Sequence, residues 1–147
     1  MMTLYDYAAR LVDEVRERPG GDDDPFILWC LESTPLGIEL HDEIPWCSAF
    51  VNRCAWHLRL PRSKRANARS WLDIGEAVSL QSAEVASDIV VLKRGTNPTQ
   101  GHVGIFAGID TTGPGIKVRV LGGNQSNSVT IASYTIDDVL GIRRLRP

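Results

Sequence analysis

One cysteine of this chain stands where local structure makes a thiol reactive. Cys47 follows Pro45 and Trp46, and the apolar residues after it recur at helical spacing, so a helix is predicted to begin here. The start of a helix presents unpaired backbone N–H groups and a partial positive charge, and both favour the thiolate form of cysteine. Cys47 is therefore a candidate nucleophile for covalent catalysis, provided that a histidine reaches it.

The chain has three histidines, and the predicted elements distinguish them. His57 lies on the same predicted helix as Cys47, roughly 15 Å further along its axis, which is too far for a hydrogen bond. His41 lies in a loop among acidic residues, where a solvated surface histidine is the simpler interpretation. His102 opens a predicted strand, a rigid platform from which an imidazole can face a helix start. We predict that His102 is the base, against the alternative that it only caps a strand.

A catalytic imidazole needs a third group that fixes its tautomer and orientation. About twenty residues after His102, another predicted strand ends in Gly122, Gly123, Asn124 and Gln125. The amide oxygen of Asn124 on a neighbouring strand can accept the imidazole N–H. The alternative is a plain turn, because Gly-Gly-Asn is favourable turn chemistry.

The remaining pattern predicts helices in the first half of the chain and strands in the second. Asp24 before Pro25 is typical of a helix cap, and Gly75 of a helix stop. Helices are predicted over residues 4–15, 25–32, 47–60 and 68–74, and strands over 88–92, 103–109, 117–121, 129–134 and 139–142. This order indicates an α+β fold in which an antiparallel sheet packs on the helix of Cys47.

Composition narrows the class of protein. The chain has 147 residues, of which 43% are hydrophobic and 23% charged, as expected for one soluble domain spanning 1–147. Its net charge of −2 argues against nucleic-acid binding as the main activity. The basic end of the chain, residues 143–146, is interpreted as solvated charge, with attraction to an anionic surface as the alternative.

Targeting and cysteine patterns are equally restrictive. No apolar run approaches the roughly 20 residues of a transmembrane segment, and no signal-peptide pattern opens the chain. We therefore expect synthesis in a cytoplasm. The three cysteines form no C-x-x-C pair, so neither a disulfide framework nor a zinc ribbon is expected. Cys30 and Cys54 are expected to be buried as small hydrophobic residues.

Several ordered segments resemble one known family. They are DEIPWCSAFVN at residues 42–52, ARSWL at 68–72, DIVV at 88–91, GHVG at 101–104 and GGNQ at 122–125. In this order they resemble the phage-associated branch of the CHAP cysteine amidohydrolase/peptidase family, which is related to NlpC-type wall peptidases. The segment PGGDDDP at residues 19–25 is similar to the lead-in of the same group, so the resemblance covers nearly the whole chain.

The resemblance implies a papain-like α+β fold and hydrolysis of peptidoglycan amide bonds. It places the nucleophile at Cys47, the base at His102 and the orienting residue at Asn124, and it requires no metal or cofactor. Many family members carry a glutamate two residues before the asparagine, whereas this chain has Gly122. On this basis Asn124 is expected to orient the imidazole alone.

Four residues complete the predicted site as substrate-binding candidates. They are Trp46, Asp42, Gln125 and Trp71. For Trp71 a role as a core anchor is the stronger interpretation, and for Asp42 solvated loop charge is equally compatible. The run Asp22 to Asp24 invites a calcium interpretation, but its spacing is not that of an EF-hand loop, so no metal site is predicted.

The resemblance implies a peptidoglycan hydrolase, expected to be a monomer and a phage or prophage lysin that reaches the wall after release by a holin or by another export route. An enzyme delivered between bacteria is one alternative. A catalytically inactive wall-binding or virion module is another. Cleavage of the muramoyl–alanine bond and cleavage within the stem peptide use the same chemistry, so both stay open.

Overall fold

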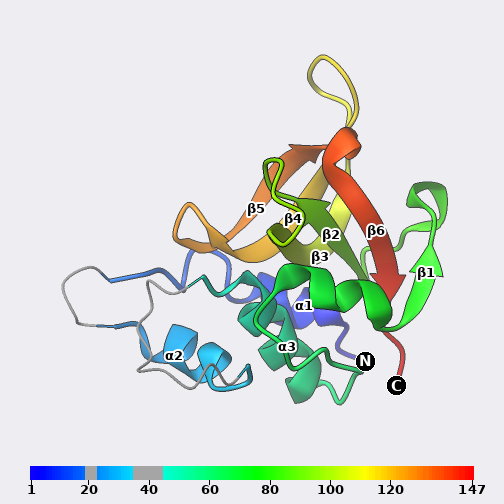
Figure 1. The fold of residues 1–147 in the computed structure, drawn as a ribbon. Coiled ribbons are helices and arrows are strands. Elements are labelled where there is room, and N and C mark those ends of the chain that lie inside the picture. Colours follow the sequence, from blue (N-terminus) through cyan, green and yellow to red (C-terminus); the bar gives the residue numbers. More distant parts are fainter. Residues whose placement is uncertain (19–22, 35–44) are drawn as a thin grey trace.

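A computed structural model describes residues 1–18, 23–34 and 45–147 of the chain. Three α-helices come first, α1 (Leu4–Ala9), α2 (Pro25–Leu31) and α3 (Cys47–His57), followed by the 3-10 helix η1 (Ala68–Asp73). Figure 1 shows α1, α3 and η1 gathered beside the sheet, with α2 further out. No helix in the described ranges is long and apolar enough to cross a membrane.

The second half of the chain forms one sheet in which all strand pairs are antiparallel. Its order is β1-β6-β2-β3-β4-β5. The strands are β1 (Glu76–Val78), β2 (Asp88–Lys93), β3 (Gly101–Asp110), β4 (Lys117–Gln125), β5 (Ser128–Thr135) and β6 (Val139–Arg144). Short 3-10 turns, η2 (Leu80–Ser82) and η3 (Ile136–Asp138), lie between them.

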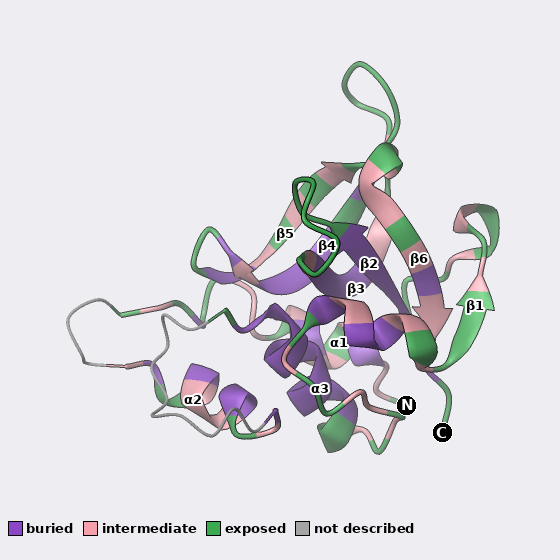
Figure 2. Cartoon of the chain, viewed as in Figure 1, coloured by how far each residue is buried: buried purple, intermediate pink, exposed green. Residues whose placement is uncertain are grey.

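The core lies between α3 and one face of this sheet. Alternate residues of β2 and β3, such as Ile89 and Ile105, share a buried cluster with Phe50 and Val51 of α3. The opposite face carries a smaller cluster that includes Leu92 and Phe106. Figure 2 shows the resulting burial of α3, β2 and β3. The predicted α+β, papain-like class, with the helix of Cys47 packed on an antiparallel sheet, is confirmed.

Element boundaries differ from the prediction where tertiary contacts override local pattern. The first helix ends at Ala9 instead of residue 15, because Asp13 takes a positive φ of 64° and its N–H donates to the Val129 carbonyl. Arg16 then forms an isolated antiparallel β-bridge with Ser128, the first residue of β5. The helix α3 ends at His57 instead of residue 60. The three-residue strand β1 was not predicted, since it is a short and largely exposed edge strand.

Polar contacts fix the first turn of α3. The Ser48 hydroxyl donates to the Arg65 carbonyl at 2.6 Å and accepts from the Trp71 indole N–H at 3.0 Å. The Asn52 amide donates to the Ser48 carbonyl at 3.0 Å, and its oxygen accepts from the Lys64 backbone N–H at 2.8 Å. The residue that follows Cys47 is therefore tied to the core and to the loop after α3.

Candidate active site

The helix α3 begins at Cys47, as the sequence predicts, and its approach to the sheet is close. Trp46, the residue before it, is fully buried, and its indole N–H donates to the Glu17 carboxylate at 2.9 Å. A Cβ on Gly123 of β4 would lie 2.4 Å from the Trp46 ring and 2.9 Å from Phe50 Cβ. Only glycine permits this approach, and it holds the start of α3 against the end of β4.

The thiol of Cys47 lies in a buried environment, with only 5% of the residue exposed. Burial raises its pKa above the usual value, because desolvation disfavours the thiolate. The Val103 backbone N–H, the charge of Arg94 and the backbone N–H groups of Ser48 and Cys47 act in the opposite direction and offset part of this effect. The stabilisation expected at a helix start is thus present, but burial outweighs it before a substrate is bound.

His102 is the second residue of β3, and only 2% of it is exposed. The N–H of Val103, its neighbour in β3, acts on the Cys47 thiol, so the structure brings nucleophile and predicted base to the same end of this strand. The Nε2 atom lies 2.8 Å from Gln125 Oε1, and Nδ1 lies 3.4 Å from an Arg94 Nη2 atom. The ring also packs on Tyr134 at 5.4 Å between centroids.

The contacts of Gln125 determine the tautomer of this imidazole. Its amide nitrogen donates to the carbonyls of Val120 and Thr130, at 3.2 and 2.8 Å. Its oxygen accepts from the Tyr134 hydroxyl at 3.0 Å, so it faces His102 as an acceptor. Nε2 of His102 must then carry the proton, so the lone pair of the ring is on Nδ1, the atom that Arg94 faces.

Burial also keeps this imidazole neutral. Desolvation lowers the pKa of His102 from its usual 6.5 to about 4; the Gln125 hydrogen bond raises it in part, and the Arg94 charge lowers it. At neutral pH the substrate-free site therefore holds a thiol and a neutral imidazole. Such an imidazole can accept a proton at Nδ1 when the reaction requires it.

Gln125, not the predicted Asn124, is the residue that the structure places against the His102 ring. Between β4 and β5 the register passes from Gly122 opposite Thr130 to Gln125 opposite Ser128, so β4 contains one extra residue. Asn124 lies in this bulge with a φ of 59°, and its side chain makes no hydrogen bond with any residue that the structure describes. The bulge reverses the alternation of side chains, which puts Gln125 instead of Asn124 on the face of Gly122 and of the imidazole.

Gly122 explains how the glutamine fits. A Cβ at this position would lie 2.9 Å from Gln125 Oε1 and 3.3 Å from His102 Nε2. The side chain of Gln125 therefore occupies the space that a side chain at position 122 would fill. This residue was predicted to bind substrate, but it is 5% exposed and contacts the base instead. Asn124, Ser126 and Asn127 around it all have positive φ, and the sequence signal for this irregularity is the run of Asn and Ser after two glycines, residue types typical of turns.

A cavity of about 240 Å³ gives access to the thiol. It is lined by Pro45, Cys47, Ala66, Asn67, Ala68, Arg94, Thr99, Gln100 and Gly101. Neither tryptophan of the predicted substrate set lines it, because Trp46 and Trp71 are both 0% exposed and belong to the core. Asp42, Glu43 and His41 lie outside the described residues. Arg94 was not predicted as a site residue.

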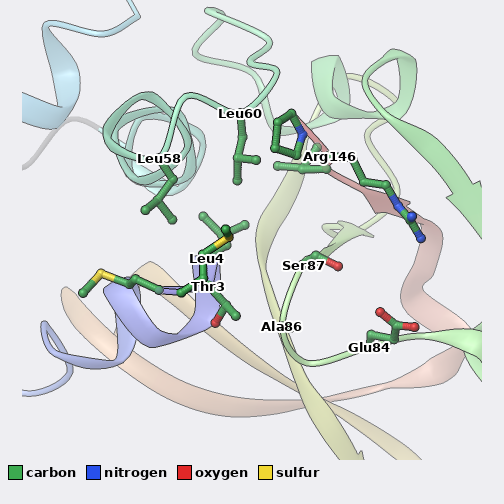
Figure 3. Close-up of a pocket in the computed structure, with 12 residues that line it drawn as sticks. Thr3, Leu4, Leu58, Leu60, Glu84, Ala86, Ser87 and Arg146 are labelled. Carbon is green, nitrogen blue, oxygen red and sulfur yellow. The ribbon is translucent and has the colours of Figure 1, made fainter.

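A larger cavity of about 560 Å³ lies at the other end of α3. Figure 3 shows it between Leu58, Leu60 and Leu4 on one side and Ser87 and Arg146 on the other. The residues that line it include neither histidine nor cysteine. It therefore offers neither a thiol nor an imidazole, and its hydroxyl groups, on Thr3 and Ser87, have no histidine beside them among the lining residues.

The described part of the chain contains no cluster of three or more His, Cys, Asp or Glu residues arranged to hold a metal ion. Asp24 caps α2, as predicted, by accepting from the backbone N–H groups of Phe26 and Ile27. Asp22 lies outside the described residues. Cys30 and Cys54 are fully buried free thiols, as predicted, and burial raises the pKa of both.

Comparison with known proteins agrees with this geometry. The family model described as CHAP domain matches residues 40–124, which is more than half of the 147-residue chain. The matched segment includes Cys47 and His102. No curated protein matches the chain.

Proposed function

The chain belongs to the CHAP domain family, whose members are cysteine- and histidine-dependent amidohydrolases or peptidases of peptidoglycan, and we propose that it cleaves a wall amide bond with Cys47 as nucleophile. The observation that carries this proposal is the hydrogen bond of 2.8 Å between His102 Nε2 and Gln125 Oε1. It leaves Nδ1 as the atom that accepts the Cys47 proton. A Cys–His–Gln set takes the place of the Cys–His–Asn set expected from the motif.

The proposed reaction begins when His102 Nδ1 takes the proton of the Cys47 thiol. The thiolate attacks the amide carbonyl, and the new C–S bond forms as the carbonyl oxygen becomes an oxyanion. The backbone N–H of Cys47 at the start of α3 is the first donor to that oxyanion. The imidazolium then protonates the leaving amine, and water hydrolyses the thioester to release the second product and the thiol.

The proposed reaction starts from a neutral Cys47 thiol and a neutral His102 imidazole. Burial raises the pKa of Cys47 and lowers that of His102, so burial favours the neutral thiol and the neutral imidazole over the ion pair in the substrate-free site. A substrate carbonyl beside Cys47 withdraws charge from the sulfur as the C–S bond forms. The proton on His102 is then consumed by the leaving amine.

Within this activity we propose a role as a phage or prophage lysin, which rests on the resemblance of the ordered motifs to the phage-associated branch of the family. Production in a bacterial cytoplasm with and without a membrane-permeabilising protein tests it. Lysis that occurs only with permeabilisation supports this role. An absence of lysis under both conditions, from an enzyme that digests isolated wall, favours the effector alternative.

The decisive test of the activity is digestion of purified peptidoglycan by wild-type protein and by the Cys47→Ala variant, with mass spectrometry of the released fragments. We expect only the wild type to cleave, and the fragment masses then identify the bond. If folded wild type releases nothing from several wall chemotypes, the inactive wall-binding alternative replaces this proposal. If both proteins cleave, Cys47 is not the nucleophile.

A further inference from the structure

The cavity that opens on Cys47 contains one side chain for which the reaction above has no use. Arg94 follows directly after β2, is exposed and lines this cavity. Among the described residues, its side chain makes one hydrogen-bond contact, from Nη2 to His102 Nδ1 at 3.4 Å. A guanidinium has five N–H donors, so most of its donors have no partner among the residues that the structure describes.

Among the described residues that line the cavity, Arg94 is the only charged one. None of the described residues that line it is acidic. The other arginine nearby, Arg69, uses its N–H groups on the backbone carbonyls of Gln100 and Asn97, at 2.8 and 3.4 Å. Arg69 therefore holds the loop that walls the cavity, whereas Arg94 presents its donors to whatever enters.

From this placement we propose that Arg94 forms a carboxylate subsite beside the nucleophile and selects substrates that carry a free carboxylate near the scissile amide. The planar fork of a guanidinium matches the two oxygens of a carboxylate. Peptidoglycan stem peptides carry such carboxylates, and some are replaced by carboxamides. The assignment of stem peptides as the ligand rests on the proposed function, but the chemistry of the subsite does not.

The subsite also affects the base. The Arg94 N–H that faces His102 Nδ1 points at the lone pair that must accept the Cys47 proton. A carboxylate bound to Arg94 draws the guanidinium toward itself and frees that lone pair. The same contact therefore couples the presence of a suitable substrate to the availability of the base.

The first test uses two alkylating reagents that differ by one carboxylate, iodoacetate and iodoacetamide. Their rates at Cys47 are followed by peptide mass spectrometry, and the ratio is normalised to that of a small free thiol. We expect the normalised ratio to fall by about tenfold in Arg94→Gln, the size of one lost charged hydrogen bond. Arg94→Lys should retain part of the preference.

Lys93→Gln is the matched control, because it removes an adjacent exposed cation whose recorded ion pair is with Asp138. Its ratio should equal that of the wild type. Equal ratios in wild type and Arg94→Gln overturn the subsite. An equal fall in Lys93→Gln also overturns it, since general surface charge then explains the preference.

A second test compares wall fragments that carry either the carboxylate or its carboxamide beside the cleaved bond. The wild type should prefer the carboxylate in kcat/KM by about tenfold, and Arg94→Gln should lose this preference. A preference that persists in Arg94→Gln overturns the assignment. If no fragment is cleaved by any variant while the alkylation ratio still falls, the subsite stands and the proposed function fails.

Discussion

The two ends of α3 open onto two cavities of opposite character. At its N-terminus, the cavity of about 240 Å³ is lined by Cys47, by Arg94 and by polar residues such as Asn67 and Gln100. At its C-terminus, the cavity of about 560 Å³ is lined largely by apolar side chains and by both ends of the chain. The larger cavity has the volume of a ligand site, but the smaller one has the converging polar groups. Chemistry follows the orientation of a few donors and acceptors more closely than it follows volume.

The test with the largest expected effect substitutes one histidine near each end of α3. His102→Asn should lower kcat/KM on peptidoglycan by about 10³-fold, because it removes the proton acceptor. His57→Asn should change it less than about twofold, since His57 is exposed and only stacks on Tyr7. Turbidity assays on purified wall measure both, with circular dichroism as the control for folding. Similar losses in the two variants would remove the distinction between the ends.

The second test uses the burial of His102 in the unfolding equilibrium. Its pKa is depressed from 6.5 to about 4 in the fold, so the unfolded chain binds the proton more readily between these values. The contribution of His102 to the free energy of unfolding is most favourable above about pH 6.5, where the imidazole is neutral in both states. As the pH falls toward 4, the unfolded chain takes up the proton and the free energy of unfolding decreases by up to about 3 kcal/mol. Urea unfolding at a series of pH values measures it.

The control for this pH dependence is again the histidine at the other end of α3. The His102→Asn variant should lose that part of the slope between pH 6.5 and 4, whereas His57→Asn should retain it. A wild-type slope that persists in His102→Asn would mean that other groups cause it.

A sharper comparison lies within the small site, between Gln125 and Asn124. Gln125→Leu removes a buried hydrogen-bond partner of His102 and should lower kcat by about 10- to 100-fold. Asn124→Gly keeps the positive φ that the bulge requires and should cost less than about threefold. Steady-state kinetics on a soluble wall fragment separate kcat from KM. The reverse ranking would restore Asn124 as the orienting residue.

The smallest expected effect concerns the hydroxyl of Tyr134. It donates to Gln125 Oε1 at 3.0 Å, the oxygen that also faces His102. Tyr134→Phe keeps the ring that packs on the imidazole and removes one hydrogen bond, so kcat should fall by about two- to fivefold. Tyr5→Phe, on α1, is a matched control that should leave kcat unchanged. An unaltered kcat in Tyr134→Phe would show that Gln125 is oriented by its backbone contacts alone.

The fold class predicted from the sequence is confirmed, and the structure places Cys47 at a helix start and His102 at a strand start as predicted, but Gln125 was not predicted as the partner of His102. The positions of Cys47 and His102 could be predicted because proline, glycine and the period of apolar residues mark a helix start and a strand start locally. The contact of Gln125 with His102 could not be predicted, because the orientation of its side chain depends on one extra residue in β4. A bulge reverses every later side chain, and the period-2 pattern carries no record of it.

Tertiary packing also explains why the two tryptophans do not have the substrate-binding position that was predicted for them. A tryptophan beside a nucleophile fits both a groove and a core, and only the packed structure decides. Trp46 and Trp71 are both buried, with their indole N–H groups bonded to Glu17 and Ser48. Arg94 was overlooked for the opposite reason. It stands in no motif, and its proximity to His102 comes from the pairing of β2 with β3.

The space beside the imidazole admits one oxygen, and two positions compete to supply it. Gly122 leaves room for the Gln125 amide, and any larger side chain at 122 would enter the same volume. The identities of these two residues therefore constrain each other, because a side chain at position 122 would displace the Gln125 amide from the imidazole. A motif that demands an acid at the earlier position would classify this chain as incomplete. The acceptor of this site is better recognised by the location of its oxygen, 2.8 Å from His102 Nε2, than by its place in a motif.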